Sequence, residues 1–413
     1  MIAQLHSYVT TPIKFFDTSA KVFLICSVFF MPLGNAPTNI FMALTLMAWV
    51  IAGGYKERFQ KISGNQLAWS ALALFALICV GALYSTGEIS DIKYQLLKYT
   101  KLLFLVVAIS LLQDKKWRDW GMNAFALAML ITLTLSLASA VSPISFVKGT
   151  AHGAVGNHYV FKDHIAQNLI MSFFVILMLV RSQAQPTKLR QYIYLVIATC
   201  SIIDIIFFVQ GRTGFISLAA NTIIFVIFFT PKKNRKIWFS CVLLAGLALL
   251  YSSNNFTSRM KLAINEFKQQ DKKELSSIGQ RVEFTNKSLA LIKESPVFGF
   301  GTGSYAKEFC RIAISEEWCQ AGKFHPHNQF MAFGVQLGLL GIFVYGIFLW
   351  SAANLARQFP LPEKVIGLAL VATLIVDSFL HAPLFLITEA QFFTLLLALT
   401  MSNTSLKEKI HDD

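Results

Sequence analysis

The sequence predicts an all-α membrane protein with about twelve transmembrane helices and a helical loop on one side of the membrane. Of its 413 residues, 55% are hydrophobic and only 14% are charged. The apolar runs are long enough to cross a bilayer, and no soluble domain requires so many of them. They are continuous rather than alternating, which favours helices over a closed β-barrel. We therefore expect one integrated polytopic membrane domain.

Twelve spans are predicted in chain order, and the first pair is expected to form a hairpin broken at Pro32 and Pro37. The spans cover roughly residues 20–36, 38–53, 67–85, 99–113, 120–141, 165–181, 191–209, 213–230, 236–252, 328–352, 364–382 and 384–401. Spans one to nine thus fall in 1–252, a loop cap in 253–327, and the last three spans with a tail in 328–413. The polar segment 1–17 lacks a small-residue cleavage site, so the first span is predicted to be a retained anchor.

The basic residues predict the orientation of the chain. Loops on the N-terminal side carry fifteen lysines and arginines, whereas the short loops opposite carry about five. Basic residues gather on the cytoplasmic side of membrane proteins, so both termini are predicted to lie in the cytoplasm. The same placement explains the net charge of +14 without a nucleic-acid partner. The segments left facing outward are 86–98, 142–164, 210–213, 253–327 and 382–384.

The long outer loop, 253–327, is predicted to fold as a small helical cap. It holds 11 basic and 8 acidic residues, a mixed charge that does not indicate disorder. Residues 258–269 and 280–294 have the apolar spacing of amphipathic helices, and a glycine-rich break follows at 296–304. Cys310 and Cys319 lie in this loop with eight residues between them, and an oxidising outer compartment favours a disulfide. The remaining cysteines fall in spans and are expected to be buried thiols: Cys26, Cys79, Cys200 and Cys241.

The segment from Lys323 to Phe330 is the most informative polar stretch, because it lies where the long loop becomes an apolar helix. It contains His325, His327 and Asn328. Histidine exchanges a proton near neutral pH, and an interfacial site offers it both water and an apolar wall. The alternative is an ordinary helix cap.

Two arginines face the same side. Arg212 lies between two apolar spans with almost no loop, where a charge is costly and usually has a partner; the alternative is a side chain that extends to the lipid headgroups. Thr213 is expected to cap the next helix. Arg281, on its own, is a solvated surface charge, but two arginines together suit a diphosphate. The glycines at 299, 301 and 303 form either an anion-binding nest or a plain turn.

Other polar residues have weaker signals. His158, with Asp163 and His164 close behind, could line the same outward cavity, although no tight spacing indicates a metal site. Asp204, Asp377 and Glu389 are acids within predicted spans. Each is expected to pair with a neighbouring helix, unless the protein is a proton-coupled transporter.

Five motifs in order resemble the O-antigen ligase and polymerase superfamily over roughly residues 195–350. They lie at 211–214, 279–281, 294–303, 325–330 and 336–341. With twelve spans and a medium-sized outer loop, the chain is most similar to an O-antigen ligase. That resemblance implies a GT-C-like fold and an inverting glycosyltransferase of the bacterial inner membrane, with its active site facing the periplasm. It implies an undecaprenyl-diphosphate-linked O-polysaccharide as donor, lipid A–core as acceptor, and no nucleotide sugar, cofactor or metal.

The resemblance also implies roles for individual residues. Arg212 and Arg281 would bind the diphosphate, and His327 would accept a proton from the acceptor hydroxyl, oriented by His325 or Asn328. The resemblance also implies a supporting role for His158. An O-antigen polymerase or a protein O-oligosaccharyltransferase is the nearest alternative. A transporter or flippase of lipid-linked glycans is another; it predicts internal repeats, which the sequence lacks.

Overall fold

The computed structural model describes residues 2–142, 144, 157–209, 211–252, 257, 261 and 277–402, and in this part of the chain every regular element is a helix. The N-terminal half comprises α1 (Ile2–Phe30), α2 (Asn35–Ala52), α3 (Tyr55–Ser63), α4 (Gln66–Leu83), α5 (Ile89–Tyr99), α6 (Lys101–Leu111), α7 (Lys115–Val141) and α9 (His164–Gln183). The C-terminal half comprises α10 (Lys188–Ile203), the π-helix η1 (Asp204–Phe208), α11 (Arg212–Phe229), the short η2 (Lys232–Asn234), α12 (Arg235–Ser252), α14 (Ser277–Glu294), α15 (Tyr305–Ile312), α16 (Glu316–Gly322), α17 (Gln329–Arg357), α18 (Leu361–Leu380) and α19 (Ile387–Met401).

Each of the twelve predicted spans falls on a helix. Within the described residues, eight helices are long and apolar enough to cross a membrane, and α19 is a shorter apolar helix. The polytopic all-helical class is therefore confirmed, while the number of crossings stays a prediction.

Two segments that the sequence predicted to be loops are helical. The outward segment 86–98 contains α5, which continues into α6. Its inner face is formed by Ile92, Gln95, Leu96 and Tyr99, a spacing that places one side chain per turn against the bundle. On the opposite side, the basic loop after α2 contains α3. The predicted helix at 280–294 is present as α14, whereas the one at 258–269 lies outside the described residues.

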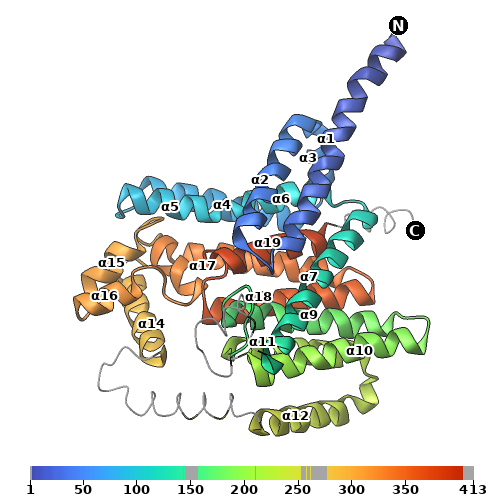
Figure 1. The fold of residues 1–413 in the computed structure, drawn as a ribbon. Helices are drawn as coiled ribbons and strands as arrows, with labels where there is room; N and C mark the ends of the chain where they lie inside the picture. Colours follow the sequence, from blue (N-terminus) through green and yellow to red (C-terminus); the bar gives the residue numbers. More distant parts are fainter. Residues whose placement is uncertain are drawn as a thin grey trace.

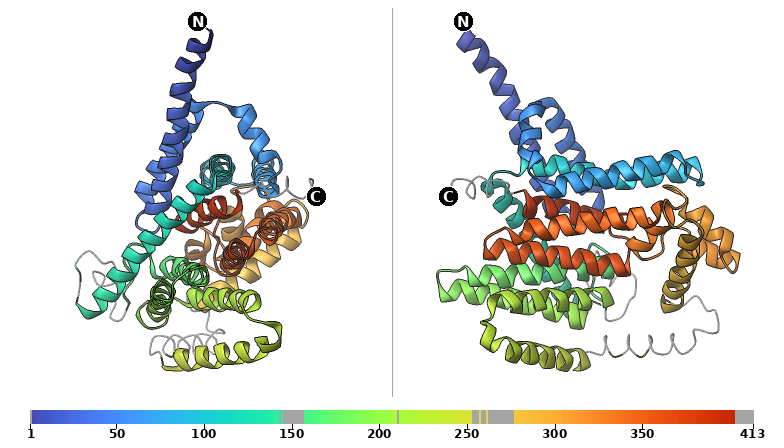
Figure 2. Two further views of the ribbon diagram at one scale, coloured as in Figure 1. Left: turned by 90° about the vertical axis from the view of Figure 1, so that its right-hand side faces the viewer. Right: turned by 180° about the vertical axis from the view of Figure 1, so that it is seen from behind.

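The long helices α9, α10, α11, α17 and α18 lie side by side, and α1 crosses them obliquely (Figures 1 and 2). Helices α14, α15 and α16 gather at one end of the bundle, and the start of α1 projects away from them (Figure 1). Hydrogen bonds also join connections that lie at the same end of the bundle. At one end the Asn65 amide donates to the carbonyl of Met401, and at the other the Tyr84 hydroxyl donates to the carbonyl of Phe298. The two ends match the two groups of loops separated by charge.

The glycine-rich segment at 296–304 wedges between α4 and α17. The amide of Gly301 donates to the carbonyl of Gln336 at 2.7 Å, and the amide of Gly303 donates to Gln336 Oε1 at 2.7 Å. The amides of Gly299, Phe300 and Thr302 likewise donate to protein carbonyls. Because these N–H groups already have acceptors, the anion-nest hypothesis is wrong and the segment is a packed turn.

Gly338 makes this packing possible by bending α17. Its φ is 66°, and a Cβ atom there would lie 2.2 Å from the carbonyl oxygen of Val297. The amide of Leu339 bonds to the carbonyl of Pro296 at 2.7 Å instead of continuing the helix. The turn thus replaces helical hydrogen bonds that the bend removes.

A second hydrophobic core joins α14, α15 and α16 to the start of α17. Phe284, Phe309 and Trp318 are buried in it, beside Val335 of α17. Cys310 and Cys319 form a disulfide between α15 and α16, with their Cα atoms 4.6 Å apart. The loop helices therefore form a compact unit attached to the bundle end.

We expect Gly338→Ala to lower stability by about 2 kcal/mol, because alanine is strained at positive φ and its Cβ would displace the 296–304 turn. The measurement is the thermal unfolding midpoint in detergent. Gly346→Ala is the matched control in the same helix, because nothing lies within 4 Å of its Cβ position. Equal midpoints for the two variants would contradict this account of the bend.

Candidate functional site

The turn that precedes α17 holds two histidines in a constrained conformation. His327 has a φ of 53°, the one positive value outside glycine in the described part of the chain. Such a conformation costs about 1–3 kcal/mol and persists where surrounding contacts enforce it. The backbone amide of His327 donates to His325 Nδ1 at 3.2 Å. Asn328 then caps α17, its Oδ1 accepting from the amide of Met331 at 3.0 Å.

Three imidazoles meet beneath α14. The ring centroids of His325 and His327 are 4.3 Å apart, and those of His327 and His381 are 6.1 Å apart. Phe284 of α14 stacks on His327 at 5.9 Å with an interplanar angle of 11°. We call His325, His327 and His381 the histidine cluster. The α14 helix covers one of its faces, which removes that face from water.

His381 belongs to a buried pair that sequence reasoning missed. Its Nδ1 donates to Asp377 Oδ1 at 2.8 Å, and only 3% of His381 and none of Asp377 is exposed. An imidazole that donates from Nδ1 to a carboxylate keeps Nε2 as an acceptor. The signal was the four-residue spacing at the end of a predicted span, which places both side chains on one helix face. The sequence did not by itself indicate that Asp377 and His381 form a pair.

His325 and His327 stay neutral at physiological pH. Burial, followed by the charge of His381, lowers the pKa of His325 to about 4. Burial, followed by the charges of His325, His381 and Arg281, lowers the pKa of His327 to about 3. A neutral imidazole can accept a proton, whereas a charged one cannot. The His327 Nδ1 atom is buried, and no described residue hydrogen-bonds to it.

Arg281 lies close enough to act on this cluster. It is half-buried on α14, one helical turn before Phe284, and its charge contributes to the lowered pKa of His327. The structure therefore brings Arg281, His325, His327 and Asn328 to one end of the bundle.

Arg212 lies at the same height along the bundle as His381, on the neighbouring helix α11. It is the first residue of α11, which packs antiparallel to α18. Asn221 of α11 donates to Thr373 of α18 at 3.0 Å. Nine residues separate Arg212 from Asn221 and eight separate Thr373 from His381, so the rise of 1.5 Å per residue places Arg212 level with His381.

Two predicted residues lie elsewhere or act differently. His158 contacts α7, its Nδ1 lying 3.1 Å from the Ser139 hydroxyl, and its amide donates to the carbonyl of Phe208. Burial lowers its pKa as well. Thr213 does not cap α11: the N-cap is Gly211, and Thr213 is a buried residue of the first turn. Among the described residues, no group of three or more His, Cys, Asp and Glu side chains is arranged to hold a metal ion.

These features define a polytopic helical membrane protein with a partly buried histidine cluster and arginines at one end. Residues 193–346 match the family model described as O-antigen ligase. This match confirms the resemblance to the O-antigen ligase family predicted over roughly 195–350. A comparison with curated proteins gives no match. The matched segment includes Arg212, Arg281, His325, His327 and Asn328; His381 and Asp377 lie beyond it.

We expect the pKa of His327 to rise in Arg281→Gln, because the substitution removes a neighbouring positive charge that disfavours the imidazolium. Protonation of His327 should then begin at higher pH than in the unmodified protein. The measurement is a pH titration of the histidine signals by NMR with carbon-13-labelled histidine. Lys287→Gln, on the same helix and paired with Glu283, should leave the titration unchanged. An unshifted His327 in Arg281→Gln would contradict the proximity of the two side chains.

Proposed function

We propose that the protein is an inverting glycosyltransferase that transfers O-antigen polysaccharide from undecaprenyl diphosphate to lipid A–core at the periplasmic face of the bacterial inner membrane. The family match supports a ligase of this kind. The observation that carries the proposal is the neutral, half-buried His327 within electrostatic range of Arg281. The site thus offers a proton acceptor beside a permanent positive charge.

In this mechanism the acceptor hydroxyl attacks the anomeric carbon of the donor sugar from the face opposite the diphosphate. A new carbon–oxygen bond forms, the bond from the anomeric carbon to the phosphate oxygen breaks, and undecaprenyl diphosphate leaves. The hydroxyl proton passes to His327, which is neutral before the step. Because the displacement is direct, the anomeric configuration inverts.

Arg212 and Arg281 stabilise the charge that develops on the departing diphosphate. A guanidinium is charged at all relevant pH values and offers a fork of donors that fits phosphate oxygens. Stabilisation of this kind is the largest contribution in many transfer reactions, and it needs no metal ion in this scheme. Phe284, stacked on His327, limits access of water that would hydrolyse the donor.

His381 supports His327 in two ways. Its ring lies 6.1 Å from His327 and restricts where the acceptor hydroxyl can sit. Its bond to Asp377 holds the tautomer with Nε2 as acceptor, so an acceptor hydroxyl between the rings would meet two proton-accepting nitrogens. We assign His381 and Asp377 as positioning residues.

His327→Ala should reduce transfer by about 10²–10⁴-fold, the usual contribution of a positioned general base. The assay measures glycan transfer from a lipid-diphosphate donor to lipid A–core with purified protein, and inversion is checked from the anomeric configuration of the product. Lys323→Ala, in the same loop, should retain wild-type transfer. A fully active His327→Ala protein would end this mechanism. In a deletion strain, loss of all O-antigen on core indicates a ligase, whereas single-repeat caps indicate a polymerase.

Asp377→Asn should reduce transfer by about 10²–10⁴-fold with the thermal midpoint preserved, because the amide can hold His381 in the wrong tautomer. A purely structural role would instead lower the midpoint and leave the pH profile of the remaining activity unchanged. Asp204→Asn is the matched control: Asp204 is equally buried but hydrogen-bonds to Ser136 at 2.5 Å, outside the histidine cluster. If both substitutions reduced transfer equally, the specific role of Asp377 would be refuted.

A further inference from the structure

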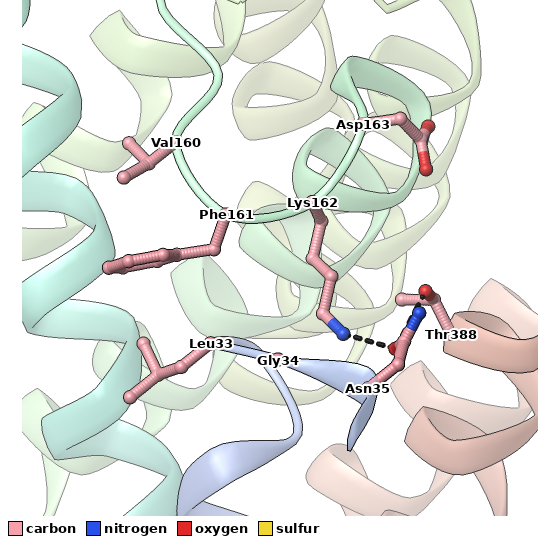
Figure 3. Close-up of a pocket in the computed structure, with 8 residues that line it drawn as sticks. All are labelled: Leu33, Gly34, Asn35, Val160, Phe161, Lys162, Asp163 and Thr388. Atoms are coloured by element: carbon pink, nitrogen blue, oxygen red, sulfur yellow. Dashed lines mark hydrogen bonds between the residues drawn. The ribbon is translucent and has the colours of Figure 1, made fainter. Parts of the chain in front are cut away.

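A polar pocket separate from the histidine cluster opens between three segments distant in the sequence. The turn between α1 and α2, the loop before α9 and the first turn of α19 enclose a cavity of about 450 Å³ (Figure 3). This volume lies within the range of about 300–1,000 Å³ typical of small-molecule sites. Asn35, Phe161, Lys162, Asp163 and Thr388 line it.

A buried lysine distinguishes this pocket from an ordinary surface hollow. Only 5% of Lys162 is exposed, and its ammonium group donates to Asn35 Oδ1. The Thr388 hydroxyl donates to the same oxygen at 3.2 Å (Figure 3). Burial of an ammonium is costly unless it is paired, and Lys162 lies within electrostatic range of the Glu389 side chain. The structure thus holds a positive charge and a polar network at the wall of a cavity.

The lining groups decide what kind of ligand fits. Asp163 is exposed and caps α9 through Oδ1, which accepts from the amides of Ile165 and Ala166, so its second oxygen can accept from a ligand. A free anion would be repelled by Asp163, and a metal ion would be repelled by Lys162. A pocket with both donors and acceptors suits a ligand whose groups do both, as hydroxyls do.

The aromatic side chain adds the apolar surface that a sugar ring needs. Phe161 and Asp163 leave the loop on opposite sides, and Lys162 points between them toward Asn35 (Figure 3). A pyranose has hydroxyls around its rim and a C–H face that packs on an aromatic ring. The pocket therefore matches a neutral sugar better than a phosphate or a cation.

The pocket adjoins the histidine cluster through the turn between α18 and α19. That turn begins at His381 and ends at Leu386, and Thr388 on the pocket wall is the second residue of α19. The charge of Asp163 also acts on Asp377, the partner of His381. A sugar held here would lie near the pair of Asp377 and His381 that positions His327.

We propose that this pocket binds a neutral sugar ring of the acceptor oligosaccharide and directs its hydroxyl toward the histidine cluster. The inference rests on the proposed transferase function. It assigns acceptor recognition to Phe161, Lys162 and Asp163, and donor diphosphate recognition to the separate arginines.

The test measures initial rates with the full-length protein, varying lipid A–core at saturating donor and then the reverse. Asp163→Asn removes a charge but keeps a good helix cap, and Phe161→Leu removes the aromatic face. Each should raise the KM for lipid A–core by about 3- to 10-fold, the loss expected for one polar or stacking contact, with the donor KM unchanged. Asp119→Asn and Phe343→Leu make the same chemical changes on exposed surfaces away from the pocket and should match the unmodified protein. A raised donor KM, or an unchanged acceptor KM, would overturn the assignment.

Direct binding separates this inference from the proposed function. Delipidated core oligosaccharide is the probe, and saturation-transfer NMR without donor measures its binding. Binding that weakens in the Asp163→Asn, Phe161→Leu double variant supports the pocket even if the unmodified protein transfers no glycan, a result that would refute only the transferase proposal. Normal transfer with unweakened probe binding in the double variant would refute only the pocket. Displacement of the probe by millimolar inorganic phosphate, abolished in Lys162→Met, would show an anion site and overturn the sugar assignment.

Discussion

Partial burial of the histidine cluster is the constraint on which the proposed chemistry depends. His327 is covered by Phe284, and its conformation is held by the bond from its amide to His325. Burial and the nearby Arg281 keep the imidazole neutral. Without α14 the ring would be solvated and its pKa would return toward the ordinary value. The helical unit outside the bundle thus sets the electrostatics of a turn that belongs to α17.

The packed glycine turn and the bend in α17 hold this unit in place. Gly338 lets the 296–304 segment approach α17, and Gln336 bonds to that segment through both its backbone and its side chain. The glycine-rich segment therefore has a structural role, because the N–H groups that could have bound an anion already donate to acceptors within the protein. Its importance for function is indirect, because it fixes where α14 sits over the cluster.

The two polar sites divide the proposed reaction between donor and acceptor. Arginines belong beside the leaving diphosphate, because only permanent positive charge stabilises it throughout the step. The pocket lined by Lys162 and Asp163 has charges of both signs, which favours a neutral, hydroxyl-rich ligand. The turn from His381 to Thr388 connects the two. This arrangement would bring an acceptor hydroxyl to the histidines without placing it against the diphosphate.

The sequence by itself determined the helical membrane class, the sorting of loops into two groups, the loop helix at 280–294 and the family motifs, because hydropathy and charge act locally along the chain. It marked His327 and both arginines as candidates. It missed the helix at 89–99, left the glycines open as an anion site or a plain turn, and assigned Thr213 a cap at a helix whose N-cap residue is Gly211. Only the tertiary structure paired His381 with Asp377, placed His158 against Ser139 and assembled the pocket from residues 33–35, 160–163 and 388. These features depend on which helices become neighbours, and that is decided by packing across the whole bundle rather than by any local pattern.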